Sequence, residues 1–132
     1  MDALPRHLQY GEQAVIQSHS LIFGPGDPVG STPVYFIIAG LVRIEYGSGD
    51  ARLPIYLMPE SVFGLTEALA DSDRLCTARA MEKTIVYRWD LESFFIASGV
   101  SWELALAATT GMTRELRILN AEFGERVGAG GA

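Results

Sequence analysis

The sequence predicts a mainly β domain that ends in helices, and three observations lead to this fold class. From about Val15 to Arg88, apolar residues recur with period two or in short runs, as in strands that bury one face. Clusters of glycine, proline and aspartate separate these runs at strand-length intervals. After Trp89 the period of the apolar residues changes to that of a helix. A β sandwich or barrel followed by helices accounts for all three observations.

The expected strands are bounded by residues that favour turns. Gly24 to Asp27, Gly47 to Asp50 and Pro59-Glu60 supply these turns, because such residues accept positive φ or preset a turn. The expected strands are Ala14 to Gln17, Ser20 to Phe23, Val34 to Ala39, Leu41 to Tyr46, Arg52 to Leu57, Leu75 to Ala80 and Thr84 to Arg88.

A short helix is expected directly after the last strand. Asp90 can cap it, it continues through Ala97, and Gly99 breaks it. Trp89 and Trp102 flank this helix, and both are expected to anchor the core.

A long helix is expected next. Ser101 can cap it, helped by Glu103 in its first turn, and the helical pattern continues to about Phe123. Residues 1–124 are therefore expected to form one domain that includes this helix, with residues 125–132 as a flexible tail.

The long helix carries an apolar stripe. A helix of some twenty-odd residues is roughly 33 Å long, which exceeds what one small barrel can cover. The stripe is therefore expected to pair with a second copy, and Gly111 would allow the two helices to approach closely. The alternative is that the stripe packs on its own barrel. The predicted dimer interface is Ala108, Met112, Leu116, Leu119 and Phe123.

Composition and charge exclude several function classes. The net charge of −6 opposes direct binding to nucleic acid, which needs a concentrated basic surface. The N-terminus lacks the apolar core of a signal peptide, and the longest apolar stretch, around Val34 to Val42, is too short to span a bilayer. A cytoplasmic protein with no membrane contact is expected.

Catalysis and metal binding are not expected. His7 and His19 are too far apart for helical ligand spacing, and no catalytic triad or phosphate-loop signature is present. Cys76 is the only cysteine, so an intramolecular disulfide and a cysteine-rich zinc site are excluded. Cys76 is expected to be a buried small residue, with redox sensing as the alternative.

An ordered set of motifs covers roughly Ser18 to Phe123. It comprises Ser20-Leu21-Ile22-Phe23 before a glycine-aspartate turn, a strand pair joined at Gly40, the segment Phe63 to Ala80, and Asp90 with Phe94. This succession resembles the cyclic-nucleotide-binding domain of the cAMP receptor protein and FNR family of bacterial transcription regulators. The resemblance implies a double-stranded β-helix, or jelly-roll, with flanking helices and a long C-terminal helix.

The segment Phe63 to Ala80 resembles the phosphate-binding cassette of that family. The resemblance makes Arg74 the arginine that pairs with a cyclic phosphate and Gly64 the glycine of the turn, while Leu65 stands where a glutamate holds the ribose. Glu67 lies two residues further along the helical turn, so its side chain would point away from that of Leu65. The implied ligand-binding positions are Gly64, Leu65, Thr66, Arg74, Leu75 and Asn120.

The departures from the family pattern oppose tight cAMP binding. Leu65 cannot hold a ribose hydroxyl, Leu75 would crowd a phosphate, and Leu119 with Asn120 occupies the place of the threonine and serine that read adenine. Two alternatives stay open. Arg74 binds a cyclic nucleotide or another small anion, such as the 2-oxoglutarate that some relatives sense. Otherwise Arg74 only balances Glu67 and the nearby aspartates, and no ligand binds.

The resemblance therefore implies a dimeric sensory domain of a transcription regulator that responds to a small anionic effector. Family regulators continue into a helix-turn-helix module, and this sequence ends before one. The alternative function is a ligand-free, stand-alone module for protein interaction with a degenerate pocket.

Overall fold

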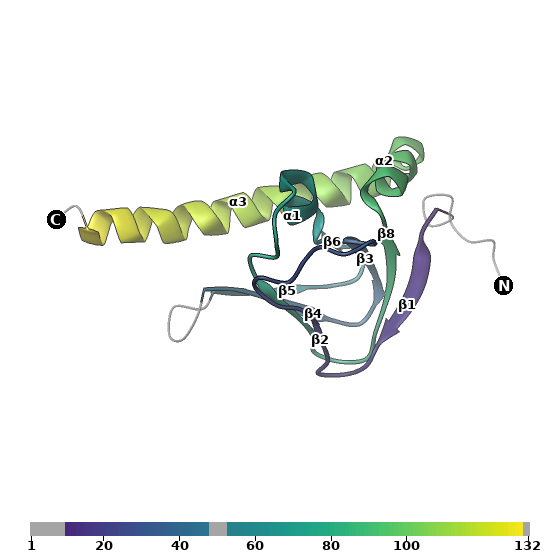
Figure 1. The fold of residues 1–132 in the computed structure, drawn as a ribbon, viewed down its shortest axis with the longest axis horizontal. Coiled ribbons are helices and arrows are strands. Elements are labelled where there is room, and N and C mark those ends of the chain that lie inside the picture. The colour runs from purple at the N-terminus through teal and green to yellow at the C-terminus, as the bar shows by residue number, and fades with distance from the viewer. Residues whose placement is uncertain (1–9, 48–52, 131–132) are drawn as a thin grey trace.

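The computed structural model describes residues 10–47 and 53–130, with the backbone alone for residues 53, 116 and 118–130 (Figure 1). Within these ranges, eight strands form two four-stranded antiparallel sheets. The first sheet has the order β1 (Glu12–Ile16), β8 (Thr84–Trp89), β3 (Val34–Ala39) and β6 (Val62–Phe63). The second has the order β2 (Leu21–Phe23), β7 (Thr77–Ala80), β4 (Val42–Tyr46) and β5 (Leu53–Leu57). The predicted mainly β class is confirmed.

Gly40 connects the two sheets between β3 and β4. Its φ is +108°, which glycine adopts readily and other residues rarely do. A Cβ at this position would lie 2.7 Å from the Cα of Thr84 and 2.8 Å from the carbonyl oxygen of Lys83. The bend predicted at Gly40 is confirmed, and no larger residue fits there.

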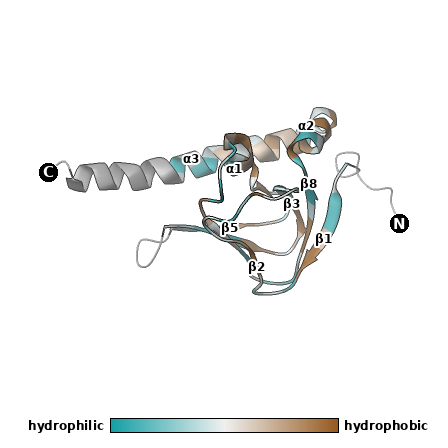
Figure 2. Cartoon of the chain, viewed as in Figure 1, coloured by the Kyte–Doolittle hydropathy of each residue, from teal (hydrophilic) through white to brown (hydrophobic). Residues whose placement is uncertain are grey.

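Two groups of buried side chains form the core. One group fills the barrel and includes Ile37, Val86 and Ala78, each fully buried. The other lies between the first sheet and the helices, around Trp89 and Leu104. In contrast to these apolar groups, the middle of α3 is hydrophilic where the helix leaves the barrel (Figure 2).

Three helices accompany the sheets: α1 (Leu65–Ala70), α2 (Leu91–Val100) and α3 (Trp102–Gly130). The predicted caps are confirmed, since the carboxylate of Asp90 accepts a 2.7 Å hydrogen bond from Ser93 N and the hydroxyl of Ser101 accepts one of 3.2 Å from Leu104 N. Gly99 does not break α2. The expected end of the long helix near Phe123 is also wrong, because α3 continues to Gly130.

The inner face of α3 packs against its own barrel. Ala108 is only 7% exposed and belongs to the core beside Leu104, and Met112 packs against the same group. At Gly111 a Cβ would lie 3.0 Å from the carbonyl oxygen of Val62 in β6. The close approach that Gly111 allows is therefore to this chain's own sheet, as the alternative prediction had it. Trp102, expected in the core, is instead 74% exposed.

Candidate effector site

The segment between β6 and β7 forms a compact cassette under α3. Gly64 has φ +85°, so the chain turns sharply there and enters the short helix α1. A Cβ on Gly64 would collide with the carbonyl oxygen of Pro33 and would lie 3.1 Å from Nη1 of Arg74. Glycine is therefore required both by the backbone conformation and by the space.

Arg74 is buried at the base of this cassette, with 2% of its surface exposed. Its Nη1 donates a 2.8 Å hydrogen bond to the carbonyl oxygen of Gly64, and its Nη2 donates one of 2.8 Å to that of Pro33. The guanidinium also lies 4.1 Å from the ring centroid of Phe23, a cation–π distance. Arg74 is thus a buried arginine whose guanidinium is held by two backbone carbonyl groups.

The carboxylate of Glu67 lies beside this guanidinium. Its Oε2 is 3.7 Å from Nη1 of Arg74, and the side chains of both residues are almost fully buried. Its Oε1 lies 3.5 Å from the backbone N–H of Leu75 and 3.7 Å from the thiol of Cys76, both of which donate to it. An internal carboxylate therefore occupies the space next to Arg74, where the family resemblance implies a bound anion.

A second carboxylate reaches the cassette from α3. Glu115 accepts a 2.8 Å hydrogen bond from the hydroxyl of Thr66 in α1 and another from the phenol of Tyr46 in β4. Burial raises the pKa of Glu115, and the negative charge of Glu67 raises it further, while the hydrogen bonds and Arg74 act in the opposite direction. Glu115 thus connects α3 with α1 and with the second sheet.

The neighbouring thiol and phenol stay neutral at ordinary pH. Burial and the charge of Glu67 raise the pKa of Cys76 to about 12. Burial and the charge of Glu115 likewise raise the pKa of Tyr46. Because a reactive cysteine needs an accessible thiolate, these surroundings do not favour redox sensing at Cys76.

The structure places the predicted ligand-binding residues in different surroundings. Leu65 is buried in the core beneath the helices, and Leu75 is 59% exposed. Thr66 is engaged with Glu115. Gly64 and Arg74 do come together, as predicted. The side chain of Asn120 lies outside the described residues, as do those of Leu116, Leu119 and Phe123.

Sequence reasoning missed the role of Glu115 and left that of Glu67 open. It placed Glu67 on the opposite side of α1 from Leu65, and it named Glu67 as a partner of Arg74 only in the ligand-free alternative, which the ion pair supports on this point. The acidic residues around Arg74 were the available signal. No local pattern marks Glu115, whose partners Tyr46 and Thr66 lie far from it in the sequence.

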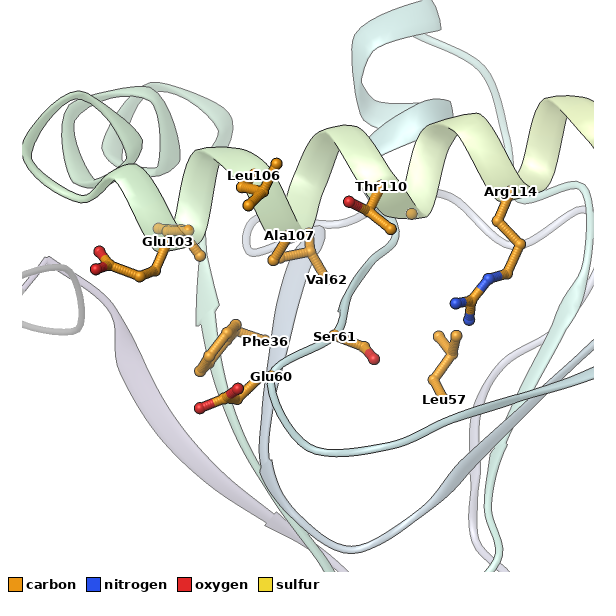
Figure 3. Close-up of a pocket in the computed structure, with 12 residues that line it drawn as sticks. Phe36, Leu57, Glu60, Ser61, Val62, Glu103, Leu106, Ala107, Thr110 and Arg114 are labelled. Atoms are coloured by element: carbon orange, nitrogen blue, oxygen red, sulfur yellow. The ribbon is translucent and has the colours of Figure 1, made fainter.

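A cavity of about 490 Å³ lies along α3, away from the cassette (Figure 3). Its floor consists of buried apolar residues such as Phe36, Leu57 and Val62. Figure 3 shows Arg114 extending from α3 toward Leu57, with Glu60 and Glu103 farther along the groove.

Comparison with known proteins identifies the fold. A family model described as the cyclic nucleotide-binding domain matches residues 13–97, well over half of the chain. The chain belongs to the cyclic nucleotide-binding domain family. The resemblance inferred from the motifs is confirmed, and so is the jelly-roll fold. A comparison with curated protein sequences gives no match.

Solved structures of this domain family show the same architecture. The catabolite activator protein of Thermus thermophilus has a TM-score of 0.70 and 23% identity, over 89% of this chain and 55% of that one. The heme domain of CooA from Carboxydothermus hydrogenoformans also has a TM-score of 0.70, with 15% identity over 91% of this chain and 86% of that one. The N-terminal domain of a transcriptional regulator from Streptomyces coelicolor A3(2) has a TM-score of 0.55 and 21% identity, over 85% of this chain and 80% of that one.

These similarities establish the fold. The chain spans only 55% of the length of the Thermus thermophilus protein. Within the described ranges, no cluster of histidine, cysteine and acidic residues is arranged to hold a metal ion. No helix in those ranges has the length and apolar character needed to cross a membrane.

Proposed function

We propose that this cyclic nucleotide-binding domain is the regulatory domain of a CRP/FNR-type transcription regulator, with no catalytic activity of its own. In its cassette, the carboxylate of Glu67 occupies the position beside Arg74, and we call this arrangement the closed cassette. The closed cassette keeps its structure without a bound cyclic nucleotide. The domain works in the cytoplasm as a homodimer formed through α3. The similarity in fold to two bacterial regulators and to the N-terminal domain of a third supports the regulatory role.

The ion pair between Glu67 and Arg74 carries the proposal for the cassette. An incoming anion must displace the carboxylate of Glu67, which is tethered beside the guanidinium and is 4% exposed. Displacement would leave a buried carboxylate without its cation, a loss of about 3 to 5 kcal/mol. Leu65 offers no hydrogen bond to a ribose in return. The geometry therefore favours the closed cassette over the anionic effector.

An anionic effector at Arg74 is the second candidate function. The Nε of Arg74 is buried and has no hydrogen-bond partner among the described residues, so one donor of the guanidinium is left over. A small carboxylate such as 2-oxoglutarate needs no ribose contact, so Leu65 would not weaken its binding. This candidate requires Glu67 to move away from Arg74 when the effector arrives.

Thermal-shift measurements on four chains separate the two candidates. The chains are the wild type, Glu67→Ala, Arg74→Ala and the double variant, each tested with cAMP, cGMP, cyclic di-GMP and 2-oxoglutarate. The closed cassette predicts no shift for the wild type, and a shift for Glu67→Ala that disappears when Arg74 is also replaced. A wild-type shift that is lost in Arg74→Ala would instead establish the effector. Glu60→Ala, an exposed acidic position outside the cassette, is the matched control.

If neither the wild type nor Glu67→Ala shows a thermal shift with any anion, Arg74 is not an anion site. The argument that the carboxylate of Glu67 takes the place of a bound anion would then be wrong. A wild-type shift that survives Arg74→Ala would place binding outside the cassette.

The proposed dimer uses the outward face of α3. Ala108 has almost no exposed surface to offer a second copy, whereas Trp102 and Leu106 are 74% and 51% exposed. Leu106 also borders the groove in Figure 3. Exposed apolar side chains on the first turns of a long helix are typical of a surface that another chain covers. We therefore move the near half of the predicted interface to this face. Leu119 and Phe123 continue the stripe of Ala108 and Met112 on the other side of the helix, and with Leu116 they remain a separate prediction from the sequence.

A further inference from the structure

The outward face of α2 is apolar. Phe95, Ile96 and Val100 are large hydrophobic residues, yet each is about half exposed. At about 100° per residue, their side chains lie within an arc of about 140° on the helix, opposite Phe94 and Ala97, which are buried in the core. A helix with apolar residues on all sides is normally buried, and exposed apolar side chains that lie together are typical of a surface that another molecule covers.

Gly99 leaves a hole in the middle of this face. Glu92, Phe95, Ile96 and Gly99 occupy positions i, i+3, i+4 and i+7 of the helix, the spacing that frames a hole for a side chain of a second, packed helix. Apart from its chain neighbours and the backbone of its own helix, a Cβ at Gly99 would meet no atom within 4 Å, so the hole is open. The need for a small residue accounts for a glycine at a helical position where it is otherwise unfavourable.

The charged residues on and next to this face are acidic. Glu92 lies on the face, Glu103 follows in the first turn of α3, and both are exposed. Residues 89–113 contain no lysine or arginine. The elements α1, α3 and β8 pack against α2. The helix α1 has no basic residue, and Arg88 of β8 forms a 2.7 Å ion pair with Glu12. An acidic rim around an apolar face attracts a partner that is both basic and apolar, and it repels anionic surfaces.

We propose that the outward face of α2 is a docking site for a basic amphipathic helix of another protein. An apolar side chain of that helix fills the hole at Gly99 and contacts Phe95 and Ile96, while a lysine or arginine beside it pairs with Glu92. The face is small, so a transient complex is expected. Figure 1 shows α2 at the end of the molecule opposite the projecting end of α3. The site uses neither Arg74 nor the outward face of α3, so it does not depend on the closed cassette or on the proposed dimer.

Fluorescence anisotropy with two labelled peptides and the full chain tests the docking site. Each peptide has about fourteen residues, or about four helical turns, with leucines on one face. The other face carries lysines in the first peptide and glutamates in the second. The lysine peptide should bind at least about tenfold more tightly than the glutamate peptide, and added salt should reduce this difference. Equal affinities, or no binding of the lysine peptide at about 1 mM, would overturn the proposal.

Two variants show whether the lysine peptide binds at this face. Gly99→Leu fills the hole and should weaken binding at least about tenfold, while the melting temperature should not fall, because leucine favours a helix more than glycine does. Phe95→Ser combined with Ile96→Ser removes the apolar contacts and should weaken binding equally. Leu21→Ser, at a similarly exposed leucine on β2, is the matched control and should bind as the wild type. Unchanged affinity in either variant overturns the proposal, and Gly99→Leu decides alone if the double variant does not fold.

The same variants distinguish two other occupants of the face. If the wild type binds phosphatidylglycerol vesicles and Gly99→Leu does not, the face contacts a membrane. If the sedimentation coefficient rises with protein concentration for the wild type but not for Gly99→Leu, the face contacts a second copy of this chain. Either result would overturn the docking of a basic helix.

Discussion

The carbonyl oxygen of Gly64 accepts a 2.8 Å hydrogen bond from the guanidinium of Arg74, ten positions later in the chain. This bond joins the turn at Gly64, near the start of the cassette, to the buried side chain of Arg74. It also explains why the turn and the arginine occur together, since the carbonyl at the turn is one of the acceptors that the buried guanidinium requires. Changes at either residue should therefore affect the stability of the whole segment.

Gly64→Ala should destabilise the domain more than an ordinary glycine replacement does. The alanine would have to adopt a positive φ, which is unfavourable for a residue with a Cβ. Its Cβ would also lie too close to the carbonyl oxygen of Pro33 and to the guanidinium of Arg74. Gly30→Ala is a matched control, because Gly30 has φ +77° and open space around it. Urea unfolding should give a loss about 1 to 3 kcal/mol larger for Gly64→Ala. Equal losses would mean that the backbone around Pro33 moves aside freely.

Arg74→Ala should cost about 3 to 5 kcal/mol, because Glu67 and two carbonyl groups lose a buried partner. The double replacement Arg74→Ala and Glu67→Ala should cost clearly less than the sum of the two single replacements, because the second change removes a charge already stranded by the first. Chemical denaturation of the four chains in a double-mutant cycle gives the coupling directly. Additive losses would contradict the ion pair.

The thiol of Cys76 should react slowly with a disulfide reagent in the folded protein. A pKa of about 12 leaves almost no thiolate near pH 8, and the side chain is buried. The neighbouring position is the control, since Leu75→Cys in a Cys76→Ala background places an exposed thiol one residue away. The native thiol should react at least about a hundredfold more slowly, and its rate should still increase with pH where that of the control has levelled off. Similar rates would mean that the cassette opens readily.

If the proposed dimer forms through the outward face of α3, Leu106→Glu should convert it to a monomer. A charge buried in an apolar interface costs several kcal/mol, which corresponds to a dissociation constant at least about a hundredfold weaker. Leu106 is 51% exposed in the single chain, so the replacement should leave folding intact. Leu69→Glu, a similarly exposed leucine on α1, should change nothing. Analytical ultracentrifugation checks the result, and a Leu106→Glu chain that sediments like the parent would rule out the outward face.

Local signals in the sequence predicted the features that depend on neighbouring residues alone. Gly40 predicted the bend between β3 and β4, and Asp90 and Ser101 predicted the starts of α2 and α3. The positive φ of Gly40 and the cap hydrogen bonds of Asp90 and Ser101 each involve residues only a few positions apart. β6 escaped prediction because two residues carry no recognisable period.

The candidate site was harder to predict, because its contacts are set by tertiary packing. Helical geometry correctly separated Leu65 from Glu67, yet only the fold decides which side of α1 meets Arg74. The apolar stripe on α3 was predicted from its spacing, but a stripe does not specify its partner. At Ala108 and Met112 that partner is the chain's own barrel.

The length of α3 gives the contact between Gly111 and Val62 a mechanical meaning. The helix continues for nineteen residues beyond Gly111, about 29 Å at the usual rise, and Figure 1 shows it projecting well past the sheets. A rigid rod anchored near one end amplifies rotation. Tilting α3 by about 10° at this contact would move its far end by about 5 Å, so a displacement of a fraction of an ångström beside the barrel becomes one that a neighbouring molecule can detect.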